Sequence, residues 1–276
     1  MSSDYDQLLD ATIRHLQRQK AQGVQFVEVS SQTLADFDKP APRRAAAPAA
    51  LSTMPAMNPA APAVSTPPAA GKAAAFDELR RRALACVKCP HLAASRKTVV
   101  FGVGSIDAEL MFVGEAPGAD EDEQGEPFVG KAGQLLTKII QTMGLSRQTV
   151  YIGNILKCRP DTPGQSAGNR PPKPEEMATC IPYLHEQIDL IRPKVIVALG
   201  ATAVTGLQGK TLGITKLRGQ WQTYRGTPLM PTYHPAYLLR NQALSEKRKV
   251  WEDMLAVMQK LGMPVTEKQQ GYFLKA

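Results

Sequence analysis

Four cysteines are the residues of this chain whose type and spacing point most directly to chemistry. Cys86 and Cys89 form a C-x₂-C pair, which lets two thiolates reach one metal, and Cys158 and Cys180 follow far along the chain. A helix opening at Pro174 would return Cys180 to the sheet end that carries Cys158 and so close a four-thiolate site. Such sites hold Zn²⁺ or an iron–sulfur cluster, and the spacing does not choose between them. The alternative is four unrelated buried thiols.

A second candidate is the segment "GEPFVGKA", which differs from a nucleotide-binding P-loop at one position. Gly125, Gly130 and Lys131 match the P-loop pattern, but Ala132 lacks the hydroxyl that would ligate Mg²⁺. Pro127 has no backbone N–H to offer a phosphate. Four acidic side chains just upstream would repel a triphosphate. We therefore interpret this loop as something other than a phosphate-binding loop.

Composition and charge limit the class of protein. The chain has 276 residues and a net charge of +8, which suits a polyanionic partner, although an inert basic surface would look the same. We find no apolar run long enough to cross a membrane. The acidic start "MSSDYDQLLD" does not resemble a signal or transit peptide. We expect a cytoplasmic protein without membrane contacts, in which disulfides are uncommon.

The chain divides into four parts. Residues 1–39 are predicted to be an appendage with a short amphipathic helix, which either binds an unknown partner or only solubilises the protein. Residues 40–75 contain 15 Ala, 8 Pro and no acidic residue, which favours a disordered linker. Residues 76–265 have the pattern of a globular domain, and residues 266–276 form a tail.

Apolar runs and helix-period segments alternate through the globular part. The expected strands are "ELMFVG", "VYIGNIL", "KVIVALG", "WQTYRG" and "TPLMPTYHP". The expected helices are "FDELRRRALA", "KAGQLLTKIIQTMG", "PEEMATCIPYLHEQIDLI" and "SEKRKVWEDMLAVMQKLG". This order predicts an α/β fold with a central, mostly parallel sheet. Ligands bind beyond the carboxyl ends of such strands, so residues 113–118, 153–158 and 233–237 are expected to meet in one cleft.

Four separated motifs carry a resemblance to a known family. "GEAPGADEDEQGEPFVGKAG", "NILKCRP", the C-x₂-C pair and "HPAYLLR" together resemble the family 4, iron–sulfur, uracil-DNA glycosylases. The resemblance covers residues 76 to about 260. It implies a central four-stranded parallel sheet flanked by helices. It also implies a [4Fe-4S] cluster held by the four cysteines.

The chain departs from the family pattern between its last two cysteines. The gap between Cys158 and Cys180 is 21 residues, longer than expected, and we interpret "DTPGQSAGN" within it as a small Gly/Pro loop insertion. A related branch traps its DNA covalently and carries a basic "KRRIH"-like insert, which is absent from this sequence. The resemblance therefore implies an ordinary hydrolytic enzyme that cleaves the N-glycosidic bond of deoxyuridine in DNA.

Three residues receive roles in base recognition from the resemblance. Phe128 is the aromatic platform on which the flipped uracil stacks, which suits a phenyl ring because every base has a π-face. The amide of Asn154 accepts from uracil N3–H and donates to O4. His234 donates to uracil O2, where negative charge develops as the base leaves. Taken singly, a core aromatic, a turn asparagine and a structural histidine are the alternatives.

The resemblance also assigns residues around the base and the attacking water. Glu121 stands against C5 of uracil and excludes thymine, its acidic neighbours being solvated, and Ala116 and Gly118 complete the substrate-binding set. Many uracil glycosylases carry an Asp at the position of Ala116. No carboxylate replaces it directly, so Glu115 is the candidate to orient water, or it only braces the loop.

"HPAYLLR" is expected to enter the minor groove. Leu238 is the candidate wedge that fills the gap left by the flipped base, and Arg240 is a candidate phosphate contact. The arginines at 80–82 are further phosphate candidates. We expect a monomer that acts on uracil in single- and double-stranded DNA. The main rival, which the missing Asp makes conceivable, is a non-catalytic iron–sulfur DNA-binding module.

Overall fold

The computed structural model describes residues 69–162, 165–209 and 213–274, with a mixed sheet at the centre. The strands are β1 (Val103–Gly104), β2 (Leu110–Gly114), β3 (Tyr151–Asn154), β6 (Val195–Leu199), β7 (Gln222–Tyr224) and β8 (Thr227–Thr232). Their spatial order is β1-β3-β2-β6-β8-β7. The four inner strands are parallel, as predicted. The edge strands β1 and β7 are antiparallel to their neighbours, so the sheet is wider than the predicted four strands.

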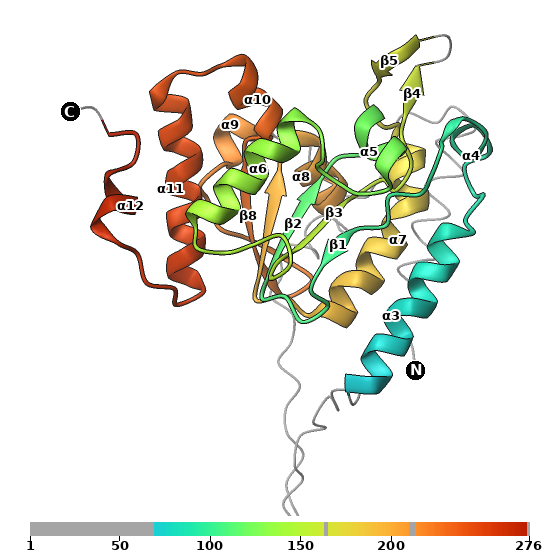
Figure 1. The fold of residues 1–276 in the computed structure, drawn as a ribbon, viewed down its shortest axis with the longest axis horizontal. Helices are drawn as coiled ribbons and strands as arrows, with labels where there is room; N and C mark the ends of the chain where they lie inside the picture. Colours follow the sequence, from blue (N-terminus) through green and yellow to red (C-terminus); the bar gives the residue numbers. More distant parts are fainter. Residues whose placement is uncertain (1–68, 163–164, 210–212, 275–276) are drawn as a thin grey trace, which may run out of the picture. The chain divides into compact units, whose positions relative to one another are not determined.

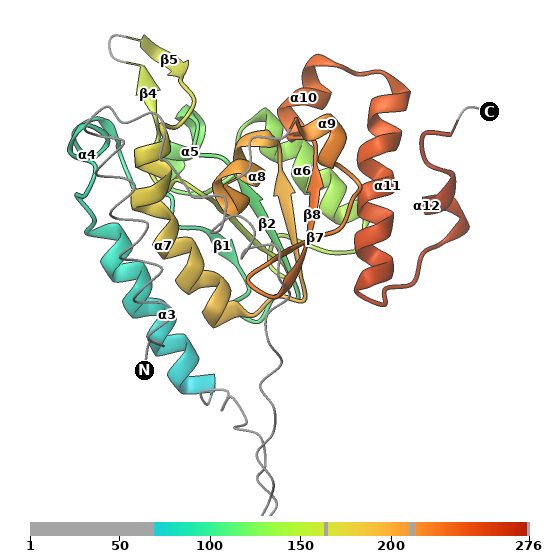
Figure 2. The ribbon, with the colours of Figure 1, turned by 180° about the vertical axis from the view of Figure 1, so that it is seen from behind.

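Helices cover both faces of this sheet because each buried strand sends successive side chains to opposite faces. In β2, Met111 and Val113 join one core cluster, whereas Leu110 and Phe112 join the other. The first face packs against α3 (Ala69–Leu84), α7 (Pro174–Ile191) and α8 (Ala201–Gln208). The second packs against α6 (Lys131–Thr142) and α11 (Leu244–Lys260). Figures 1 and 2 show these two layers of helices on either side of the strands. The predicted α/β fold is confirmed.

The shorter elements lie in the connections. They are α4 (Pro90–Ser95), α5 (Ala119–Gln124), α9 (Ile214–Leu217), α10 (Pro235–Arg240), α12 (Glu267–Gly271), β4 (Asp161–Thr162) and β5 (Gln165–Asn169). β4 and β5 pair as an antiparallel hairpin, so the interpretation of "DTPGQSAGN" as a loop was wrong. This hairpin projects beyond the carboxyl ends of the parallel strands (Figure 1).

Two element boundaries differ from the sequence-based expectation. Helix α3 begins at Ala69, inside the predicted linker, and Lys72 near its start pairs with Asp107 at 2.7 Å. In the predicted tail, α12 and the residues after it contact α11. The indole N–H of Trp251 donates to the Gln269 carbonyl, and the Tyr272 ring packs edge-on against Trp251 at 5.6 Å.

The other domain predictions stay predictions. The appendage 1–39 and the linker up to residue 68 lie outside the described residues. Among the helices that the structure describes, none is long and apolar enough to cross a membrane.

Candidate active site

The carboxyl ends of β2, β3 and β8 meet at one cavity of about 210 Å³. It is lined by residues from five separate segments: Ala116, Gly118, Glu121, Phe128, Ala132, Asn154, Asn169, His234 and Ala236. The parallel register of β2 and β3 places Gly114 beside Asn154 at this edge. All six predicted substrate-binding residues are in this set, so the structure brings them together as the sequence predicted.

Phe128 holds its ring in the cavity wall through an unusual backbone. Its φ angle is +56°, in the left-handed region that non-glycine residues seldom adopt, and its side chain is buried. Gly133 makes room for it, because a Cβ there would lie 1.9 Å from the Phe128 carbonyl group. Arg147 fixes the loop by donating to the carbonyls of Pro127 and Phe128 at 2.7 and 3.0 Å. Such local strain is characteristic of functional sites.

Asn154 presents an unsatisfied acceptor to the cavity. The residue is 2% exposed, and its Oδ1 has no hydrogen-bond partner among the described residues. Buried polar atoms are nearly always paired, so an unpaired carbonyl in a cavity wall is a binding feature. Gly114 leaves space in front of it, since a Cβ on Gly114 would lie 2.4 Å from Oδ1. The cavity is therefore ready to receive an N–H donor from a ligand.

His234 is held as a neutral imidazole. Its Nδ1 accepts from the backbone N–H of Ala236 at 3.1 Å, at the start of α10, which leaves the ring proton on Nε2. Burial lowers the pKa of His234 to about 4, and the charge of Arg240 acts in the same direction. The ring is therefore an uncharged hydrogen-bond donor at neutral pH.

The four cysteines lie together on the α3 and α7 side of the sheet. All four are free, Cys158 and Cys180 are buried, and Cys86 and Cys89 pack against the same core. No group of three or more ligating side chains among the described residues could hold a single metal ion. A polynuclear cluster has ligands that stand farther apart than those of one ion.

Nitrogen donors surround these sulfurs. An Arg96 N–H donates to Cys158 Sγ at 3.1 Å, and the backbone N–H of Lys157 donates to Cys180 Sγ at 3.2 Å. Burial raises the pKa of the Cys180 thiol to about 12, whereas the charge of Lys157 acts in the opposite direction. A buried thiol of this kind becomes a thiolate when a metal binds it. Four thiols with N–H donors to sulfur suit an iron–sulfur cluster.

Comparison with known proteins decides the family. A family model described as the Uracil DNA glycosylase superfamily matches residues 101–255. A type-4 uracil-DNA glycosylase of Thermotoga maritima is 48% identical over 174 residues, which cover 61% of this chain and 85% of the relative. The chain belongs to the family 4 uracil-DNA glycosylases.

Two further relatives extend this result. The type-4 uracil-DNA glycosylase of Sulfurisphaera tokodaii is 40% identical over 209 residues, covering 72% of this chain and 90% of the relative. That of Saccharolobus solfataricus is 44% identical over 186 residues, covering 64% of this chain and 80% of the relative. The resemblance identified from the motifs is confirmed.

In this family 4 chain, Glu121 explains the near-P-loop segment. Its carboxylate accepts from the backbone N–H groups of Gly118, Val129 and Gly130 at 2.9–3.0 Å. The N–H groups that a phosphate would need are therefore already bound, which agrees with the rejection of a nucleotide loop. The expectation that the acidic neighbours of Glu121 are solvated is wrong for Asp122. It is 2% exposed and accepts from the backbone N–H groups of Lys97 and Thr98.

Glu115 is not among the residues that line the cavity, whereas Asn169 is. Asn169 comes from β5, and Arg159 donates to its Oδ1 at 2.9 Å. The sequence analysis missed Asn169 because it ends the segment that was interpreted as a loop insertion. No local signal marks it, and only recognition of the hairpin would have brought it to the cavity.

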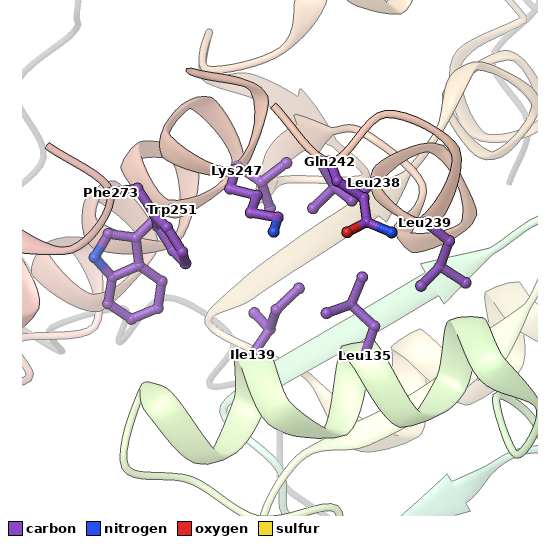
Figure 3. A pocket seen from close by; sticks show the side chains of 9 residues that line it. Leu135, Ile139, Leu238, Leu239, Gln242, Lys247, Trp251 and Phe273 are labelled. Atoms are coloured by element: carbon purple, nitrogen blue, oxygen red, sulfur yellow. The ribbon is translucent and has the colours of Figure 1, made fainter. Parts of the chain in front are cut away.

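On α10, the structure exposes a different leucine from the one predicted as the wedge. Leu238 is 5% exposed and clusters with Tyr233 and Val250, so it is not free to enter DNA. Figure 3 shows Leu238 in an apolar pocket across from Leu135 and Ile139 of α6. Leu239 is 40% exposed and is the leucine that α10 offers to a partner.

The arginine candidates also differ from one another. Arg240 is exposed at the end of α10, where a phosphate could reach it. Arg81 and Arg82 instead pair with Glu78 and Glu186 on α3 and α7. These two arginines are therefore poor phosphate contacts.

Proposed function

We propose that the protein removes uracil from DNA by hydrolysing its N-glycosidic bond, which leaves an abasic site for base excision repair. The observation that carries the proposal is the unpaired Oδ1 of Asn154 in the cavity wall. Uracil N3–H is the donor that this acceptor lacks, and the Asn154 amide N–H₂ matches uracil O4. Cytosine has no N3–H and carries an amine at C4, so the same amide mismatches it. The names of the type-4 relatives support this substrate.

The leaving group is stabilised by His234. A uracil anion forms as the glycosidic bond breaks, and a preorganised donor at O2 stabilises charge that exists mainly in the transition state. The neutral ring, with its proton on Nε2, supplies that donor without itself changing charge. Phe128 stacks on the base and keeps O2 in reach of the ring.

We assign the attacking water to Asn169. The Glu121 carboxylate is occupied by three backbone N–H groups, and Asn154 and His234 face the base. Asn169 is then the polar side chain in the lining that remains to hold a water. A strongly dissociative reaction needs the water positioned more than deprotonated, which an amide can do. We propose that Glu121 stands beside C5 of uracil and that its carboxylate fixes the loop.

The four cysteines would hold a [4Fe-4S] cluster. When bound, this cluster cross-links the segment before α4, the end of β3 and helix α7, and so supports the base-reading strand end. Thiolate ligands persist in the reducing cytoplasm, where we propose that the protein acts. We further propose that it works as a monomer on single- and double-stranded DNA. Leu239 and Arg240 would contact the duplex, and the N-terminal arm would be left free for another partner.

The test is release of uracil from matched single- and double-stranded oligonucleotides that carry U, T or C at one position. The proposal expects abasic sites only at U in both forms. Binding of DNA without any release would contradict the proposed function.

A further inference from the structure

Lys157 is a buried cation without an anionic partner among the described residues. Its side chain is 1% exposed, and no described carboxylate forms an ion pair with it. Its ammonium donates to the backbone carbonyl of Asn154 at 3.0 Å and to Oε1 of Gln187 at 2.7 Å. Both acceptors are neutral. An unpaired charge in a protein interior is strongly unfavourable, so this site calls for a nearby negative charge.

Gln187 cannot supply that charge, and its own contacts are complete. The residue is fully buried, and its Nε2 donates to the Phe101 carbonyl at 3.0 Å and to the Tyr151 hydroxyl at 2.8 Å. These contacts hold the amide so that its oxygen faces Lys157. The described network takes up two of the three N–H groups of the ammonium but does not balance its charge.

The cysteine group lies directly beside this network. The backbone N–H of Lys157 donates to Cys180 Sγ, and Cys158 is the next residue in the chain. Four thiolates around a [4Fe-4S]²⁺ core carry a net charge of about −2, which is the missing counter-charge. Arg96 also donates to this group, through Cys158 Sγ. Lys157 is thus a fully buried cation beside the cysteines.

We propose that Lys157 is a positioning residue that links the cysteine-bound cluster to the base reader, because one ammonium balances the cluster's charge and holds the Asn154 carbonyl. The inference rests on the cluster of the proposed function. Its consequence is that the charge at residue 157 sets both the reduction potential of the cluster and the affinity of the cavity for uracil. A hydrophobic contact at this position would set neither.

Lys157→Met removes the charge while keeping the length of the side chain. The matched control is Lys88→Met, which lies between Cys86 and Cys89 but is exposed, so solvent screens its charge. Each variant is purified with its cluster, and the iron content is measured. The midpoint for one-electron reduction of the cluster and the inhibition constant of free uracil are then compared with wild type.

Loss of a nearby buried cation disfavours the reduced, more negative cluster. We expect Lys157→Met to have a more negative midpoint and at least tenfold weaker inhibition by uracil, with Lys88→Met close to wild type in both. A Lys157→Met midpoint equal to that of Lys88→Met would overturn the proposal even if activity were lost.

A third variant covers the case in which Lys157→Met does not retain iron. Lys157→Arg keeps the charge, so iron retained by Lys157→Arg but not by Lys157→Met supports the charge role. Loss of iron from both Lys157→Met and Lys157→Arg would show that the shape of the side chain matters rather than its charge, and would overturn the proposal. A wild-type protein that holds iron but releases no uracil would contradict the proposed function and leave the midpoint comparison intact.

Discussion

The imidazole of His234 lies 5.7 Å from the phenyl ring of Phe128, centroid to centroid, with 33° between the ring planes. In the proposed complex, a base that stacks on Phe128 meets the imidazole at its O2 edge. This arrangement separates stacking from hydrogen bonding, because one ring supplies area and the other supplies a directed donor. Each contribution can be changed without deleting the other.

Removal of the His234 donor should slow the chemical step. We expect His234→Ala to lower the single-turnover rate of uracil release by about 100-fold, the size of effect found when one preorganised donor is lost. Because burial lowers the pKa of His234 to about 4, the neutral form prevails above that value. Protonation below it would cost the bond from the Ala236 N–H to Nδ1. The titration of His234 should therefore add no pH dependence to the wild-type rate between pH 5 and pH 8. An inflection near pH 6.5 that His234→Ala abolishes would contradict this account.

Gly133 should be essential for the position of Phe128. Gly133→Ala places a Cβ at 1.9 Å from the Phe128 carbonyl group, so the loop must move. We expect a loss of about 1–3 kcal/mol in the free energy of unfolding, as in other overpacked sites, together with weaker uracil binding. Thermal unfolding and inhibition by free uracil measure the two effects. Gly213→Ala is the control, because a Cβ there meets nothing within 4 Å; equal behaviour of the two variants would refute the packing argument.

The two leucines of α10 should fail in different ways. Leu238→Ala should lower the free energy of unfolding by about 2–5 kcal/mol, since it empties a buried apolar site. Leu239→Ala should leave stability unchanged. It should slow uracil release from double-stranded DNA more than from single strands, where the uracil has no base-pairing partner to leave. The measurement is the ratio of the two rates in each variant. A lowered double-strand rate in Leu238→Ala without loss of stability would restore Leu238 as the wedge.

The purified protein should be brown and contain about four irons with absorption near 400 nm, as is usual for [4Fe-4S] proteins. Cys158→Ala should lose the colour. Cys158 is four residues from Asn154, so uracil release should also fall. A colourless wild-type protein with one zinc, or full activity in Cys158→Ala, would count against the cluster and its coupling to the base reader.

Much of the site could be predicted because parallel strands bring their carboxyl ends to one edge. Asn154 and His234 follow buried apolar runs, so their meeting needed only the fold class. Asn169 was missed because the hairpin that carries it has two- and five-residue strands and no apolar alternation. The choice between Leu238 and Leu239 depends on the rotation of a six-residue helix, which is too short to show a period. The burial of Asp122 depends on backbone N–H groups some 25 residues away, which no local pattern reveals.

The base reader offers the most direct test of the whole account. Asn154→Asp keeps the size of the side chain, but an ionised carboxylate cannot donate to uracil O4, and its charge opposes the uracil anion. Uracil release should therefore be slower, because the activation free energy rises by at least the ~1–3 kcal/mol of an unmet buried polar group. Some slow release of cytosine should appear, because the carboxylate accepts from the cytosine amine. Gln208→Glu is the control, since the amide oxygen of Gln208 also has no partner among the described residues but Gln208 lies on α8 outside the cavity.

The measurement is abasic-site formation on matched oligonucleotides containing U or C, for wild type, Asn154→Asp and Gln208→Glu. We predict a lower uracil rate and a new cytosine rate in Asn154→Asp alone. A uracil rate in Asn154→Asp equal to that of wild type would show that Asn154 does not read the base and that the cavity at the end of β3 is not the active site.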